Sequence, residues 1–131
     1  MTTTDRIPAA ALLALIILQS VMLAALYAGV APHPPAAIVL FAIAPFLGVA
    51  LSVAVAALVL GAGSNRMGRW LGFFAALLAL LSFGPQKYFD AQFALIWPAV
   101  MGGQLGSAVL IANLLAPRLI GQPIAAQEMQ A

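Results

Sequence analysis

The chain has 131 residues, of which 65% are hydrophobic and 6% charged, with a formal net charge of +2 and no cysteine. A soluble domain of this length could not bury so much apolar surface. In soluble proteins, about a quarter of the residues are charged. The small charge, with no basic run, excludes nucleic-acid binding, and the lack of cysteine excludes disulfides and thiolate metal sites. A mean hydropathy of +1.12 indicates an integral membrane protein that contacts the lipid bilayer.

Four apolar segments have the length, or nearly the length, of membrane-spanning helices. A hydrocarbon core about 30 Å thick needs about 20 helical residues. Lipid-spanning strands would have to alternate in polarity and close into a barrel, and these segments do not alternate. We predict an all-α, integral membrane four-helix bundle of two antiparallel transmembrane hairpins, a single domain over residues 1–131, with spans at 7–30, 36–60, 67–83 and 93–116.

The first span, 7–30, is predicted to end at the proline-rich stretch 31–35, because proline lacks the amide hydrogen that a helix needs. Its Gln19 is a polar residue at membrane depth. A cleaved signal peptide is the alternative for this segment. We expect the segment to be retained, because its apolar run is longer than a usual signal core and Pro32 follows the small-residue site at 29–31.

The second span carries small residues at every fourth position. This stripe consists of Ala44, Gly48, Ser52 and Ala56. The glycine-rich stretch 61–65 is predicted to end this helix. The third span, 67–83, is short unless residues 65–69 form its first turn, with Arg66 and Arg69 extending toward the headgroups. Gly84 and Pro85 end it.

An interfacial segment is predicted between the third and fourth spans. Phe89, Phe93 and Trp97 recur at helical spacing, and Lys87 and Asp90 can pair at i, i+3. Tyr88 and Trp97 have the amphipathic rings that favour headgroup depth. The segment either anchors the fourth helix at the interface, or contacts a partner subunit, a lipid or a quinone headgroup, or forms a transport gate. The candidate contact residues are Lys87, Tyr88, Asp90, Phe93 and Trp97.

The fourth span repeats the small-residue pattern. Gly102, Gly106 and Asn113 share one face, and Gln104 and Asn113 can donate hydrogen bonds across an interface between helices. Either the stripes of the second and fourth spans both close the bundle, or one faces outward and docks another subunit. Pro117 is predicted to end the helix before a cytoplasmic tail, 117–131.

The basic residues predict an orientation. Arg6, Arg66, Arg69 and Arg118 fall on one side of a four-span topology, and Lys87 on the other. The positive-inside rule places both termini in the cytoplasm. Abundant alanine and an excess of arginine over lysine favour a bacterial inner membrane.

Ionisable residues are missing from the spans away from their ends, although such residues mark proton relays and ion paths. The small multidrug exporters are similar in size and four-helix plan, but they depend on a glutamate in the first helix, and the first Glu here is Glu128. His33 lies in the proline-rich loop with no partners for a metal site. We expect no catalytic residue, no metal and no cofactor.

The sequence therefore favours a non-catalytic accessory subunit or assembly factor that packs against a larger membrane complex. Two alternatives remain open. One is a small homo-oligomeric transporter or channel, whose polar path would be lined by Gln19, Ser52, Gln104 and Asn113. The other is a protein that binds a quinone or a lipid.

Overall fold

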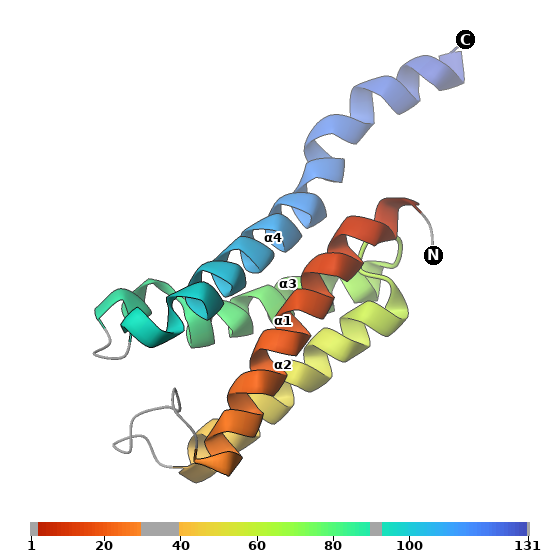
Figure 1. Cartoon of the computed structure of the whole chain (residues 1–131). Helices are drawn as coiled ribbons and strands as arrows, with labels where there is room; N and C mark the ends of the chain where they lie inside the picture. Colours follow the sequence, from red (N-terminus) through yellow and green to blue (C-terminus); the bar gives the residue numbers. More distant parts are fainter. Residues whose placement is uncertain (1–2, 30–39, 90–92, 131) are drawn as a thin grey trace.

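The structure is a computed structural model that describes residues 3–29, 40–89 and 93–130, with side chains within 5–29, 43–89 and 93–116. Its elements are α1 (Thr3–Ala28), α2 (Leu40–Leu60), α3 (Arg66–Phe83), the 3₁₀ helix η1 (Pro85–Phe89) and α4 (Phe93–Gln130), shown in Figure 1. Four helical stretches are long and apolar enough to cross a membrane: Asp5–Ala28, Ile43–Leu60, Arg66–Phe89 and Phe93–Ala116. The predicted all-α four-helix bundle is confirmed.

The helices form a ring in chain order. Each packs against the next, and α4 returns to pack against α1. α1 and α3 also touch across the middle of the ring, whereas α2 and α4 do not meet within the described ranges. Both chain ends and the α2–α3 turn lie at one end of the bundle and η1 lies at the other, as Figure 1 shows.

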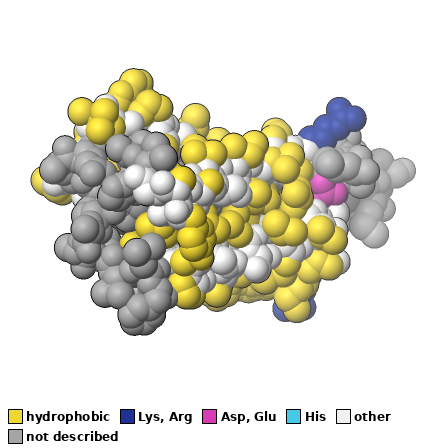
Figure 2. Space-filling view, turned by 60° about the horizontal axis from the view of Figure 1, so that its bottom comes forward, with side chains coloured by type: hydrophobic (Ala, Val, Ile, Leu, Met, Phe, Trp, Pro, Cys, Tyr) yellow, Lys and Arg dark blue, Asp and Glu magenta, His cyan; other side chains and the backbone are white. Residues whose placement is uncertain are grey.

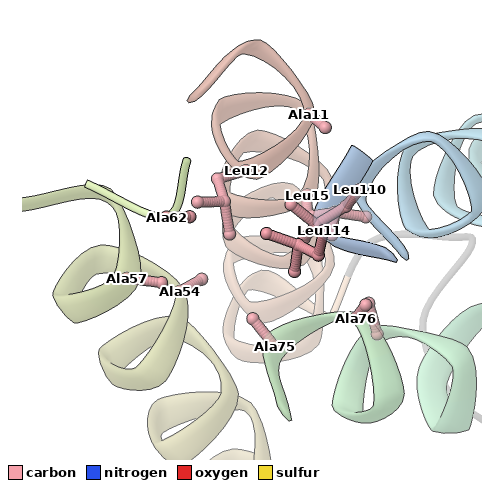
Figure 3. Close-up of a cluster of buried hydrophobic side chains, with 11 residues drawn as sticks. Ala11, Leu12, Leu15, Ala54, Ala57, Ala62, Ala75, Ala76, Leu110 and Leu114 are labelled. Atoms are coloured by element: carbon pink, nitrogen blue, oxygen red, sulfur yellow. The ribbon is translucent and has the colours of Figure 1, made fainter. Parts of the chain in front are cut away.

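The interior is built mainly from alanine. The central cluster contains seven alanines and four leucines, and Figure 3 shows them projecting from all four helices toward one another. Many of the larger hydrophobic side chains point outward, among them Ile17, Phe74 and Leu105. Figure 2 shows the resulting apolar surface, with basic and acidic side chains gathered at one end. Small residues inside and large ones outside are typical of helices that pack in lipid.

The α2–α3 turn lies where the sequence predicts it. Gly61 ends α2 with a φ of +83°, a conformation that costs glycine little. The Gly61 N–H donates to the Ala57 carbonyl at 3.1 Å, and the Gly61 carbonyl accepts from the Asn65 N–H at 2.9 Å. The Asn65 side chain then caps α3 by accepting from the N–H groups of Met67 and Gly68. The third helix therefore begins at Arg66, one residue before the predicted boundary.

Two helix ends differ from the predictions. α1 ends at Ala28, where Gly29 has a φ of +64°, two residues before the predicted boundary. The predicted terminator at 31–35, His33 included, lies outside the described residues, as do the first positions of the predicted second span. α4 does not end at Pro117 but continues as a helix to Gln130. Proline removes one hydrogen bond and bends a helix, but it does not always end one.

Gly103 shows how closely the helices approach. A Cβ atom at this position would lie 2.6 Å from Cβ and Cγ of Phe83, on α3. At Gly48, on α2, the same atom would meet nothing within 4 Å. The α3–α4 contact therefore needs a glycine at 103, whereas the described bundle does not need one at 48.

We predict that Gly103→Ala lowers the free energy of unfolding by about 1–3 kcal/mol, the usual cost of overpacking. Unfolding of the purified protein by sodium dodecyl sulfate in mixed micelles would measure it. Gly48→Ala is the matched control and should leave stability unchanged or slightly raised, because alanine favours helix. Equal effects of the two substitutions would contradict this account of the α3–α4 contact.

Candidate functional site

A hydrogen-bonded network joins η1 to the end of α3 and the middle of α4. The Tyr88 hydroxyl donates to Oε1 of Gln104 at 2.8 Å. Nε2 of Gln104 donates in turn to the backbone carbonyl of Phe83 at 3.0 Å. The Tyr88 ring lies 5.2 Å from the ring of Phe93, tilted by 57°, an arrangement that aromatic pairs favour. We call Phe83, Tyr88, Phe93 and Gln104 the η1 network.

Local hydrogen bonds explain how the chain reaches this geometry. Nε2 of Gln86 donates to the Leu81 carbonyl at 2.7 Å, which satisfies a carbonyl at the end of α3. The Lys87 N–H donates to the Gly84 carbonyl at 3.0 Å and closes the turn into η1. A Cβ atom on Gly84 would collide with the Leu80 carbonyl oxygen. The segment therefore folds back onto α4 and places Tyr88 beside Gln104.

The structure brings together only some of the predicted contact residues. Tyr88 and Phe93 meet in the η1 network, together with Gln104, which the sequence analysis placed in a separate class. Trp97 is half-exposed on α4, and Phe89, at 93% exposure, projects from the bundle. Lys87 is partly exposed, and Asp90 lies outside the described residues, so the predicted pair of these two residues stays a prediction.

The small-residue face of α4 is occupied by contacts within the bundle. A Cβ atom on Gly106 would lie 3.2 Å from Cδ2 of Leu15, and one on Gly102 would lie 3.5 Å from Cδ1 of Leu18. Both contacts are with α1. The glycines of α4 therefore let α1 approach, which is the intramolecular role that the sequence left open.

The small-residue stripe of α2, called the α2-stripe from here on, differs from the face of α4; it consists of Ala44, Gly48, Ser52 and Ala56. Besides the open space at Gly48, Ser52 is exposed, and its hydroxyl donates to the Gly48 carbonyl of its own helix at 2.8 Å. Ala44 and Ala56 are partly exposed. Among the described side chains of α2, those that are buried are Leu47, Ala50, Ala54 and Ala57. Part of the α2-stripe is thus left outside the contacts that close the bundle.

The residues of the predicted polar path do not all meet within one copy of the described chain. Ser52 is on α2, which does not touch α4, where Gln104 and Asn113 lie. The Asn113 amide donates to the Val109 carbonyl one turn earlier, at 2.8 Å, and Gln104 belongs to the η1 network. Gln19 is buried, at 1% exposure, and its Nε2 has no hydrogen-bond partner among the described residues.

A second polar cluster lies at the other end of the bundle, and the sequence analysis did not single it out as a site. Oδ1 of Asp5, at the start of α1, accepts from the Gly63 N–H at 2.9 Å. Nη2 of Arg69, on α3, donates to the Gly63 carbonyl at 3.3 Å. Both backbone groups of this glycine are thus bound by charged side chains, and Asp5 is buried. The sequence feature that could have indicated this cluster is Asp5, an acidic residue in the first turn of an otherwise apolar helix.

The described residues contain no group of three or more His, Cys, Asp or Glu side chains that could hold a metal ion. Comparison of the chain with protein-family models, with curated proteins and with solved structures finds no match.

The η1 network generates a testable prediction. Tyr88→Phe and Gln104→Leu should each destabilise the protein, and the double variant should lose less than the sum. We expect a coupling energy of about 0.5–1.5 kcal/mol, the net value of one hydrogen bond between side chains. A double-mutant cycle of unfolding free energies would measure it. Tyr27→Phe, at the exposed second tyrosine, is the control and should have no effect; additive losses would contradict the network.

The polar cluster at Gly63 generates a second testable prediction. Asp5→Ala leaves the Gly63 N–H without this acceptor, at a cost of about 1–3 kcal/mol. Amide hydrogen exchange in the α2–α3 turn should then become faster. Asp5→Asn should lose less, because the amide oxygen can still accept, and Arg6→Ala, at an exposed neighbour, should leave the turn unchanged. Unaltered exchange in Asp5→Ala would show that this bond does not hold the turn.

Proposed function

We propose that this protein is a non-catalytic accessory subunit or assembly factor that packs against another protein of the membrane through α2. The observation that carries the proposal is the α2-stripe. A Cβ atom at Gly48, which is partly exposed, would meet no other described residue within 4 Å, and Ser52, one turn later, is exposed. In lipid, small residues on a helix surface let a second helix approach closely, so packing and weak hydrogen bonds can drive association.

The composition of the spans supports a role in association. The four spans hold no ionisable residue away from their ends, and such residues usually carry proton or ion transfer in membranes. The interior is filled by alanine and leucine side chains from all four helices. The outward surface of the helices is therefore the part of the chain most suited to contact another molecule.

The proposed setting is a bacterial inner membrane, with both termini and the α2–α3 turn in the cytoplasm. Arg6, Arg66 and Arg69 lie at the end of the bundle that holds the α2–α3 turn, and Lys87 lies at the opposite end, in η1. The positive-inside rule then supports this orientation. The aromatic surface formed by Phe89 and Trp97 would face the outer interface, at the depth where amphipathic rings are favoured.

The proposal predicts that bulk on the α2-stripe releases the partner. Gly48→Leu should reduce the fraction of protein in a larger complex by about tenfold or more. A close contact between two helices that contributes about 1.4 kcal/mol to binding accounts for a tenfold change in affinity when it is lost. Native mass spectrometry after mild extraction from the membrane would measure it. Ala112→Leu, at an exposed small residue of α4, is the matched control and should leave the complex intact.

The same experiment contains the contrary outcomes. A homo-oligomer without another protein would contradict the accessory role and favour the small transporter or channel. A hetero-complex that survives Gly48→Leu would show that α2 is not the contact. Gly106→Leu is unsuitable for this purpose, because Gly106 contacts Leu15 within the bundle and its substitution would disturb the fold itself.

A further inference from the structure

An apolar hollow lies between α3 and α4, at the end of the bundle that holds the α2–α3 turn. It has a volume of about 170 Å³ and is lined by Arg69, Trp70, Phe73, Leu114 and Leu115. Trp70 and Leu115 are each about half-exposed, so the hollow opens onto the lipid-facing surface. Its walls are almost wholly apolar, so it can take up apolar groups from the surrounding lipid.

Among the described residues that line the hollow, Arg69 is the one with a charge, and the surface of the hollow itself is almost wholly apolar, so the guanidinium lies at its edge. Nη2 of Arg69 is held by the Gly63 carbonyl at 3.3 Å, and its buried Nε has no hydrogen-bond partner among the described residues. Asp5 binds the same glycine, accepting from its N–H at 2.9 Å. Arg69 as a whole remains partly exposed.

The depth of the hollow along the spans corresponds to the level at which a lipid headgroup joins its acyl chains. Leu114 and Leu115 are within the last three residues of the span Phe93–Ala116, and Arg69 is in the first turn of Arg66–Phe89. Arg69 and the two leucines therefore lie near the ends of their spans, and Trp70 and Phe73 follow Arg69 along α3 toward the bilayer centre. Arg66, three residues before Arg69 and exposed, adds a second positive charge on the same side of α3.

We propose that this hollow binds an anionic phospholipid. Its phosphate contacts the Arg69 guanidinium, and the upper part of one acyl chain fills the space beside Phe73 and Leu115. Charge complementarity carries the choice of ligand: guanidinium groups bind phosphate through charge-assisted hydrogen bonds, and basic pockets between membrane helices hold anionic headgroups. A zwitterionic lipid fits less well, because its own cation offsets the phosphate charge.

Trp70 provides the test, because it lines the hollow and the only other tryptophan is Trp97. In a Trp97→Phe background, the full chain is placed in nanodiscs of phosphatidylcholine that contain a small fraction of phosphatidylglycerol with brominated acyl chains. Bromine quenches tryptophan fluorescence at close range. We expect brominated phosphatidylglycerol to quench Trp70 with about fivefold higher apparent affinity than brominated phosphatidylcholine, the advantage that one arginine near the membrane surface gives.

Variants separate this site from general attraction of anionic lipid to a basic surface. Arg69→Gln should abolish the preference for phosphatidylglycerol, whereas Arg6→Gln, at an exposed arginine outside the hollow, should keep it. Leu115→Trp fills the hollow without removing the charge and should also abolish the preference, read from native mass spectra of lipid-bound protein. This variant decides the matter if Arg69→Gln does not fold.

Three results would overturn the proposal: equal quenching by the two brominated lipids in the parent protein, a preference that survives Arg69→Gln, or lipid retention that survives Leu115→Trp. None of them bears on packing through α2. Conversely, failure of the Gly48→Leu experiment leaves the lipid site unaffected.

Discussion

The structure depends on close packing between helices in a solvent that is itself apolar. Burying a leucine between two membrane helices gains little, because lipid tails surround it equally well outside. Association must then come from many short contacts and a few hydrogen bonds. The alanine-rich centre and the glycine contacts of α4 with Phe83 and Leu15 supply these contacts. The large side chains are left for the lipid-facing surface, where length and branching match acyl chains.

Polar interactions are concentrated at the two ends of this packed middle. At one end, Asp5 and Arg69 bind the backbone of Gly63; at the other, Tyr88 and Gln104 fasten η1 to α4. Both arrangements use side chains to satisfy or orient backbone groups where helices stop, which is where a bundle in lipid has unpaired backbone groups. The ends thus hold the connections in place, while the middle determines how near the helices lie.

Hydropathy and breaker residues predicted the number of spans and the turn at 61–65, because span length and helix termination are local properties. Helical periodicity also predicted the small-residue faces of α2 and α4. It could not tell which face packs inside, since that depends on where the neighbouring helices lie. The link between Tyr88 and Gln104 and the one between Asp5 and Gly63 escaped prediction for the same reason: their partners are 16 and 58 residues apart in the chain. The extension of α4 past Pro117 shows that one proline is weak evidence for a helix end.

The separation of Asp5 from Gly63 has a consequence for biogenesis. During synthesis the first span leaves the ribosome long before its partner glycine exists, so the Asp5 carboxylate cannot make this bond until the second span and the turn after it have been produced. The bond can form only if both hairpin ends reach the same side of the membrane. A chain in which only one of the first two spans inserts would have Asp5 and Gly63 on opposite sides of the bilayer and could not form the bond.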